Sequence, residues 1–562
     1  MDGNTNRAAR WLWLGVLAAA LVAAAALRLP AVVAGYPYLA YVDEGHVLRP
    51  AQKQIVTGTW EAAENNYPRL PSRAIAAAAR LAAAAAAPFR SKPLLTDAER
   101  ISGFYDVVDP PELVIVGRVV SVLAGLAVVV VAALYARRLA GDGAGAVAAV
   151  AAALLPALVL RGSIVIVDAY TTLFALAALA LASSASGPRP WPRVLLAGAC
   201  CGLAMVSKYP AGLVGIAVVV RLLLSPWSWR QRLARVAAAA LAGLAAALLV
   251  MPSLATETAV IWRGLLFEHR GSITHGTPSY WDQAVRRVEW DLHFERPELG
   301  VTFLLLALAG VAVAIVVPRW RRDGITWAVF VAVMVGFHAS YAFQPFRHLL
   351  PVAALGCVAV GVLAGWVGER LRRPLIVPAA VAALIVALFA PGDARYAAER
   401  ARLRDTRSQA VDWLRRHREP GQSVLVERRV ALAPADLRRL GAKVDLGWWE
   451  EEARPRVMRA EPRFLVATRV LRPDGEELFP GVDAEWLLRS YEVRAQFGSE
   501  TAIANRLTYP DNRLRVYVLE RRPGARRSFR AATKAETGVN SSSGKFSGLS
   551  QNSPSPPAPH DS

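Results

Sequence analysis

The sequence predicts an all-α, polytopic membrane protein with a small α/β domain after the last span, and three observations lead to this fold class. Of the 562 residues, 54% are apolar or aromatic, only 19% are charged, and the mean hydropathy is +0.32. The apolar residues gather into blocks of roughly 17–25 residues, the length that crosses a bilayer as a helix. Short basic segments between the blocks alternate with long segments that hold nearly all the acidic residues. This composition excludes a disordered chain and a typical soluble enzyme.

The predicted spans run from the N-terminus to about residue 391. The first block, 11–33, follows a polar start with Arg7 and Arg10, and no convincing cleavage site precedes a soluble domain, so we expect an uncleaved span. Ten further apolar blocks lie at about 113–135, 144–160, 167–184, 194–207, 209–224, 236–254, 299–317, 325–342, 348–366 and 374–391. We therefore expect about eleven transmembrane helices.

The arginines predict the orientation of these spans. If the N-terminus is cytoplasmic, every short loop on that side carries arginines, at 137–138, 189–193, 230–235, 319–322 and 370–373. Cytoplasmic loops have this bias, so we expect a multi-pass protein of the plasma (inner) membrane. The formal charge of +21 follows this topology, and no basic stripe with interleaved aromatics is present. The expected partners are therefore membrane lipids and not nucleic acid.

The sequence divides into three predicted domains. Residues 1–392 form the transmembrane domain, whose external loops are 34–112, with an Ala-rich surface helix, and 255–298. Residues 393–522 alternate helical patterns with short apolar runs, which predicts a small extracytoplasmic α/β domain. Residues 523–562 have few large apolar side chains and are expected to be a disordered tail.

Two adjacent carboxylates, Asp43 and Glu44, follow the first span closely. At the membrane surface a carboxylate can take the proton of a hydroxyl as that hydroxyl attacks a membrane-bound electrophile. The alternative is structural, because Asp and Glu are common at helix starts, where they cap the positive end. Both interpretations stay open on these residues alone.

Asp168 is a third candidate, at the outer start of the predicted span 167–184. An ionised Asp in so apolar a run costs about 2.5–3.5 kcal/mol on insertion scales, so it needs a partner or a wet cavity. In the structural alternative that partner is Arg118 or Arg161. On the predicted topology Asp168 shares a face with the Asp-Glu pair. Three carboxylates there could hold a divalent cation, or divide the work of a base and of acceptor placement.

Two cations are predicted on the same face. Lys208 lies in the outer hairpin between two spans, and Arg347 precedes the span at 348–366. Either could neutralise a phosphate leaving group, Arg through a bidentate fork and Lys as a point charge. The alternative is that both side chains simply extend to the membrane interface.

The motifs of several other enzyme classes are absent from the sequence. His269, His275 and His293 are scattered in the 255–298 loop, and no HExxH motif is present. There is also no Walker A loop, no GxSxG motif, and no GxGxxG motif in a strand–helix unit. The sequence therefore carries no visible machinery for ATP-driven transport or serine-hydrolase chemistry.

Taken in order, these features resemble the GT-C integral-membrane glycosyltransferases, in particular the branch of family 39 that includes protein O-mannosyltransferases and bacterial lipid A aminoarabinose transferases. The resemblance covers about residues 11–420. The matching segments are Asp43-Glu44 followed by Tyr67-Pro68, Arg118 with Tyr135-Ala-Arg-Arg138-Leu-Ala-Gly141, Asp168, Gly202-Leu-Ala-Met-Val-Ser-Lys208-Tyr209-Pro210, Phe346-Arg347-His348-Leu-Leu-Pro351, and Asp405-Thr-Arg407 with Trp413. One residue departs from the pattern, because His348 stands where the family more often has Tyr.

The resemblance implies transfer of a hexosyl or pentosyl residue from a polyprenyl-phosphate-linked donor to a glycan, lipid or protein acceptor on the extracytoplasmic side. It implies a single inverting displacement with Asp43 as the base, supported by Glu44 and Asp168. The one cofactor left open is a divalent cation, which these three carboxylates would hold. The implied contacts to the donor and its lipid phosphate are Lys208, Tyr209, Arg347, His348, Arg118 and Tyr67.

A secondary transporter or lipid flippase is the alternative from another class. Such a protein is expected to show an internal repeat or broken helices that meet near the midplane. The charged residues singled out above lie mainly at the outer edge of the predicted spans, which favours the glycosyltransferase. A non-catalytic scaffold that displays residues 393–522 would leave the three carboxylates without a task.

Overall fold

The computed structural model describes most of the chain in two compact units, one up to Gln409 and one formed by most of the residues after it. The described residues are 3–39, 43–58, 68–89, 111–187, 190–272, 300–339, 346–427, 430, 432–441, 443–445, 457–458, 460–468, 470–471, 477–478, 484–498 and 516–523.

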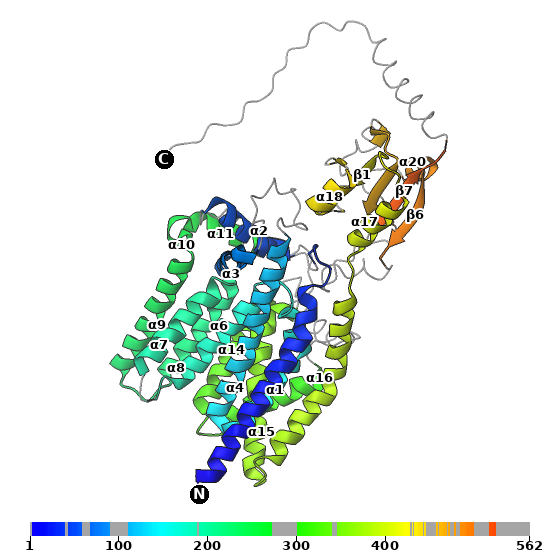
Figure 1. Cartoon of the computed structure of the whole chain (residues 1–562). Coiled ribbons are helices and arrows are strands. Elements are labelled where there is room, and N and C mark those ends of the chain that lie inside the picture. The colour runs from blue at the N-terminus through cyan, green and yellow to red at the C-terminus, as the bar shows by residue number, and fades with distance from the viewer. Residues whose placement is uncertain are drawn as a thin grey trace, which may run out of the picture. The chain divides into compact units, whose positions relative to one another are not determined.

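Unit 1 is a bundle of mostly apolar helices (Figure 1). The main helices are α1 (Gly3–Val32), α4 (Glu112–Leu154), α6 (Asp168–Ser184), α7 (Pro190–Met205), α8 (Val214–Leu223), α9 (Trp229–Val250), α13 (Val301–Val316), α14 (Arg321–Ala339), α15 (Leu350–Arg370) and α16 (Ile376–Arg402). By length and apolarity, α1, α4, α9, α15 and α16 can each cross a membrane, and α6, α8 and α13 are shorter apolar helices. The chain is thus a multi-pass membrane protein, and the total of eleven spans stays a prediction.

The 43-residue helix α4 covers two of the predicted spans. Its backbone leaves the helical region at Ala140 and Gly141, and Gly141 has φ +85°, which a glycine adopts without strain. The break separates the predicted spans 113–135 and 144–160, and the chain turns back there, because Gly145 after the break lies against Ala133 and Arg137 before it.

Small residues bring the helices of unit 1 close together. A Cβ atom added to Gly198 of α7 would lie 2.0 Å from the carbonyl oxygen of Ala239 in α9, and one added to Gly202 would lie 2.0 Å from that of Gly243. Helices in lipid gain little from hydrophobic burial and associate through close van der Waals packing, which small residues permit. The α7–α9 contact therefore depends on these glycines.

The arginine-rich turns gather at the end of unit 1 that carries the N-terminus (Figure 1). Arg221 of α8 donates to Asp323 of α14 at 3.1 Å and to the carbonyl of Ser183, at the end of α6, also at 3.1 Å. The indole of Trp320 donates to the carbonyl of Leu139 beside the α4 break at 2.8 Å. These contacts bring the turns of four helices to one end of the bundle.

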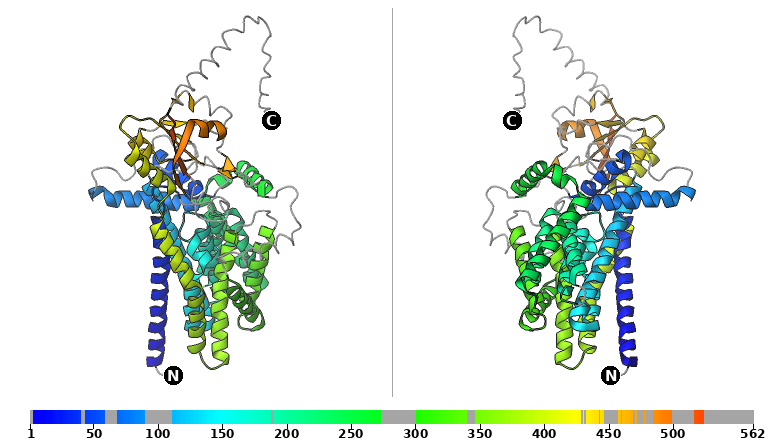
Figure 2. Two further views of the ribbon diagram at one scale, coloured as in Figure 1. Left: turned by 90° about the vertical axis from the view of Figure 1, so that its right-hand side faces the viewer. Right: turned by 90° about the vertical axis from the view of Figure 1, so that its left-hand side faces the viewer.

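Short helices cover the opposite end of unit 1. They are α2 (Glu44–Thr57), α3 (Leu70–Ala86), η1 (Ala87–Phe89), α5 (Pro156–Arg161), η2 (Tyr209–Leu213), α10 (Ser253–Thr256), α11 (Thr258–Ser272) and η3 (Phe346–Leu349). Helix α3, the predicted surface helix, lies across the direction of α1, as Figure 2 shows. The buried side chains Leu48, Ile75, Leu113 and Val165 pack together and join α2 and α3 to α4 and the loop before α6.

Unit 2 contains a five-stranded mixed sheet with the order β2-β1-β3-β7-β6. Its strands are β1 (Val424–Glu427), β2 (Lys443–Asp445), β3 (Phe464–Thr468), β6 (Tyr491–Phe497) and β7 (Val516–Arg521). Strand β1 is parallel to β2 and β3, while β7 is antiparallel to β3 and β6. The other described elements after α16 are α17 (Thr406–His417), α18 (Pro434–Leu440), α20 (Ala484–Ser490) and the pair β4 (Val470–Leu471) and β5 (Glu477–Leu478).

The predicted domain limits stay predictions. Helix α16 continues past residue 392, where the transmembrane domain was expected to end, as far as Arg402. The expected tail lies outside the described residues except for Pro523.

Candidate active site

Each of the three predicted carboxylates forms an ion pair with a different predicted cation. The pairs are Asp43 with Arg347, Glu44 with Arg118, and Asp168 with Lys208. Six residues singled out in the sequence, from five separate elements, thus come together in pairs. Their exposure differs: Glu44 and Arg118 are fully buried, Asp43 and Arg347 are both partly exposed, and in the third pair Lys208 is 18% exposed but Asp168 only 3%.

Glu44 and Arg118 form a completely buried, bidentate ion pair. The guanidinium donates Nε to Oε1 and one terminal nitrogen to Oε2, both at 2.9 Å, and both side chains are 0% exposed. Buried charges are costly unless they are paired and hydrogen-bonded, which this geometry satisfies. Neither group can reach a substrate without leaving this pair.

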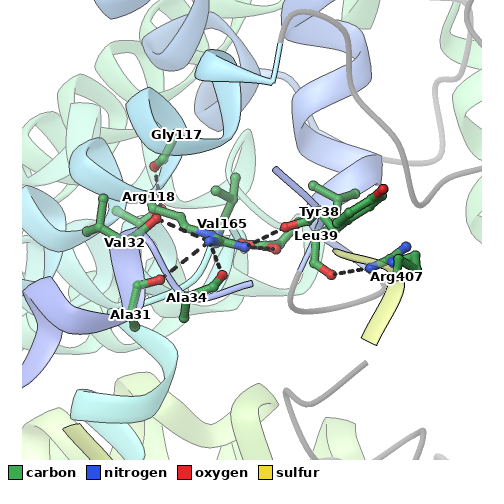
Figure 3. A network of polar contacts seen from close by, with 11 residues as sticks. Ala31, Val32, Ala34, Tyr38, Leu39, Gly117, Arg118, Val165 and Arg407 are labelled. Atoms are coloured by element: carbon green, nitrogen blue, oxygen red, sulfur yellow. Dashed lines mark hydrogen bonds and ion pairs between the residues drawn. The ribbon is translucent and has the colours of Figure 1, made fainter. Parts of the chain in front are cut away.

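The remaining donors of Arg118 hold the end of α1 (Figure 3). They reach the carbonyl oxygens of Ala34 at 2.7 Å, Val32 at 3.1 Å and Tyr38 at 3.3 Å. The last carbonyls of a helix lack intrahelical partners and carry partial negative charge, so a buried guanidinium is a fitting cap. Arg118 therefore fixes the chain on the N-terminal side of Asp43.

Glu44 also holds the loop that leads to Asp168. Its Oε1 accepts a hydrogen bond from the backbone N–H of Val165 at 3.1 Å, three residues before Asp168. One buried carboxylate thus connects the start of α2, the helix α4 and the loop before α6. Through these contacts the Glu44–Arg118 pair positions both Asp43 and Asp168.

Asp43 occupies the N-cap position of α2, but its side chain makes no capping hydrogen bond. Instead its carboxylate pairs with the guanidinium of Arg347 in η3, a residue 304 positions away in the sequence. The side chains of Asp43 and Arg347 are 19% and 14% exposed, so solvent reaches this pair. Of the two open interpretations, the side-chain contacts do not favour the capping role.

Asp168 begins α6 and pairs with Lys208 through an Oδ1–Nζ distance of 2.7 Å. The partner is thus neither Arg118 nor Arg161, the two candidates of the structural alternative. Lys208 stands just after α7, where its backbone is extended before η2. The N–H of Leu70 in α3 donates to the carbonyl of Val206 at 3.0 Å, which fixes the approach to this turn.

The Asp43–Arg347 and Asp168–Lys208 pairs influence each other electrostatically. Burial lowers the pKa of the Lys208 ammonium, and the charge of Asp168 opposes this shift. Arg347 adds to the lowering of this pKa, whereas Asp43 raises it. The four side chains therefore form one charge-balanced group of two carboxylates and two cations, which we call the four-charge cluster.

The four-charge cluster is not a metal site of three carboxylates. Within the described parts of the chain, no three or more His, Cys, Asp and Glu side chains are grouped so that they could hold a metal ion. Asp43, Glu44 and Asp168, the expected ligands of a divalent cation, each face a cation of the protein instead.

Two further predicted donor contacts, Tyr209 and His348, contact side chains of other helices or their ends. The hydroxyl of Tyr209 contacts the sulfur of Met251 at 3.8 Å, and the ring of His348 lies 5.0 Å from that of His338 in α14. Tyr67 lies outside the described residues. His338 was not among the predicted site residues, although a histidine near the end of an apolar block was a usable signal.

A second support for the loop before Asp43 was also missed. Arg407 pairs with Asp405 at 2.8 and 2.9 Å, donates to the carbonyl of Leu39 at 3.4 Å and lies 4.2 Å from the ring of Tyr38 (Figure 3). In the sequence both residues belong to a segment that resembles the GT-C family and lie within the predicted domain 393–522. The contacts of Arg407 hold the segment between α1 and Asp43.

Part of the chain matches a known protein family. Residues 101–255 match the family described as dolichyl-phosphate-mannose-protein mannosyltransferase. This stretch contains Arg118, Asp168, Lys208 and Tyr209 among the predicted site residues. A comparison with curated protein sequences found no match.

Several solved membrane enzymes have a similar structure. ArnT from Cupriavidus metallidurans bound to undecaprenyl phosphate has a TM-score of 0.56 at 13% sequence identity, over 90% of this chain and 98% of that chain. The same enzyme in the apo state has a TM-score of 0.53 at 13% identity, over 91% and 98%. The archaeal oligosaccharyltransferase AglB from Archaeoglobus fulgidus, in complex with an inhibitory peptide and a dolichol-phosphate, has a TM-score of 0.49 at 13% identity, over 85% and 75%. The chain has the fold of the GT-C membrane glycosyltransferases.

Proposed function

We propose that the protein is an inverting glycosyltransferase that moves a sugar from a polyprenyl-phosphate donor to an acceptor on the extracytoplasmic face of the plasma membrane. The observation that carries this proposal is the four-charge cluster, in which a solvent-accessible carboxylate stands among two cations at one end of a membrane bundle. The fold supports it, because the ArnT structure with this fold holds undecaprenyl phosphate.

In the proposed reaction a hydroxyl of the acceptor attacks the anomeric carbon of the donor sugar. A bond forms between the acceptor oxygen and that carbon, and the bond from carbon to the phosphate oxygen breaks with inversion. Asp43 takes the proton of the attacking hydroxyl, and polyprenyl phosphate departs with the bonding electrons. A general base of this kind contributes typically about 10²–10⁴-fold to the rate.

Lys208 and Arg347 neutralise the charge that grows on the phosphate. Electrostatic stabilisation works best when the donors are already in place and aimed at the developing charge. In the structure each cation is held by a carboxylate, Lys208 by Asp168 and Arg347 by Asp43. The phosphate would share these cations and leave Asp43 free to meet the acceptor.

Glu44 and Arg118 act as positioning residues in this proposal. Glu44 was expected to place the acceptor or a cation, and Arg118 was expected to contact the donor. The complete burial of both side chains argues against these direct roles. Asp168 is the residue that orients Lys208 through their 2.7 Å contact.

The function is tested by sugar transfer from polyprenyl-phosphate sugars with the purified full chain. If Lys208 and Arg347 act on the leaving group, Lys208→Gln and Arg347→Gln should lower turnover more than donor binding, because the charge on the bridging oxygen develops in the transition state. Arg373→Gln, which removes an exposed cation next to the α15–α16 turn, is the matched control. Unchanged turnover in both site variants would reduce these residues to interface anchors and contradict the mechanism.

A further inference from the structure

A second charged region of unit 1 has no task in the proposed reaction. It lies where α7 and α9 begin, and we call it the Arg–Trp corner. Its residues are Trp191, Arg193, Trp227, Arg230, Arg232 and Arg235. Helix α7 has 16 residues, so at a rise of about 1.5 Å per residue its start lies roughly 24 Å from the turn that carries Lys208.

The Arg–Trp corner carries an unbalanced positive charge. The sequence has no Asp or Glu between residues 169 and 256. Among the described residues, none of the four arginines of the corner forms an ion pair with a carboxylate, whereas nearby Arg221 pairs with Asp323. Four cations without a counter-anion in the protein favour an anionic partner.

Contacts hold three of the four arginines of the corner in place, and the fourth, Arg230, is exposed. The guanidinium of Arg235 lies 4.0 Å from the ring centroid of Trp227 and 4.9 Å from that of Trp191. Arg232 donates to the carbonyl of Trp227 at 2.8 Å, and Arg193 donates to that of Ser184 at 2.8 Å. Such fixed cations lose little side-chain entropy when an anion binds.

An exposed apolar surface continues from the corner along both helices. Leu195 and Leu196 of α7 are 44% and 54% exposed, and Leu233 and Leu241 of α9 are 46% and 67% exposed. Tryptophan is enriched where a membrane protein meets the head groups, and Trp191 is 44% exposed here. A ligand that matches both regions needs an anionic head and an apolar tail.

We propose that the Arg–Trp corner binds an anionic phospholipid, with the head-group phosphate among the four arginines and the acyl chains along the exposed leucines of α7 and α9. Basic pockets between membrane helices recognise such head groups, and each Arg or Lys near an anionic membrane surface adds about fivefold to the affinity. The proposal is independent of the proposed sugar transfer.

The test is native mass spectrometry of the detergent-solubilised full chain with dioleoyl-phosphatidylglycerol or dioleoyl-phosphatidylcholine as the probe lipid. The unaltered protein should retain phosphatidylglycerol at lower lipid concentration than phosphatidylcholine. Arg232→Gln/Arg235→Gln should weaken phosphatidylglycerol binding about 25-fold, and Arg230→Gln, which changes an exposed side chain, about fivefold. The matched control, Arg321→Gln/Arg372→Gln, removes two arginines from other turns of the same end and should change binding less than twofold.

Three results would overturn the proposal. Equal retention of the two lipids by the unaltered protein would show that the protein does not recognise the charge of the head group. An equal loss of binding in the control double variant would show attraction to the overall charge of this end of the bundle. Unchanged binding in Arg230→Gln, a variant whose exposed side chain leaves folding intact, would place the lipid elsewhere even if the double variant failed to fold.

Discussion

Asp43 and Glu44 are neighbours of the same chemical type, yet their surroundings predict opposite responses to loss of charge. Glu44→Gln removes the negative charge paired with the fully buried Arg118 and weakens the contacts at 2.9 Å. Breaking a buried ion pair by changing one partner typically costs about 3–5 kcal/mol, because the remaining charge is left uncompensated. We expect Glu44→Gln to destabilise the protein by an amount in this range.

The matched control is Glu369→Gln, which makes the same change in an exposed pair. Glu369 and its partner Arg319 are 47% and 51% exposed, and exposed pairs contribute at most about 1 kcal/mol. The difference in the free energy of unfolding is measured by titrating both variants with denaturant in detergent and monitoring the loss of tryptophan fluorescence. If Glu44→Gln were no less stable than Glu369→Gln but lost sugar transfer, Glu44 would have a chemical role and our positioning argument would be wrong.

Three further predictions follow from packing, charge and topology. Gly198→Ala should cost about 1–3 kcal/mol, because its Cβ would meet the Ala239 carbonyl at 2.0 Å, whereas Gly215→Ala has nothing within 4 Å and should be neutral or stabilising in the same unfolding experiment. Only protonated Lys208 can hold a phosphate, and burial lowers its pKa below 10.5, so donor binding should fall as the pH rises through that lowered value. Lys208→Arg should move this alkaline loss to higher pH, and an unshifted profile would assign the titration to another group. A cysteine at Thr57 should react with an impermeant thiol reagent in intact cells while one at Ser228 should not, and the reverse labelling would contradict the orientation.

Residue type and position were enough to single out the charged side chains that form these ion pairs. A charge at the edge of an apolar span needs a partner, so Asp168 and Lys208 were both recognisable from the sequence, and they pair at 2.7 Å. The apolar blocks likewise predicted the helices of the bundle, because the bilayer fixes their length.

The pairing itself could not be predicted, because it depends on how helices far apart in the sequence pack. Arg118 was expected near the donor or near Asp168, and only the fold brings it to Glu44, to the end of α1 and to Tyr38. Glu44 contacts the loop before Asp168 through the backbone N–H of Val165. Every residue except proline carries a backbone N–H. No side-chain pattern could reveal that contact.

Single-turnover sugar transfer by Asp43→Asn tests the central claim most directly. Asn has nearly the size of Asp and caps a helix about as well, so the variant should fold and bind donor, but it lacks the basic oxygen. With donor bound and acceptor in excess, the account predicts that transfer slows about 10²–10⁴-fold while the unfolding midpoint and donor affinity change little. Transfer at a near-normal rate would mean that the base is another group, with Asp168 the next residue to test.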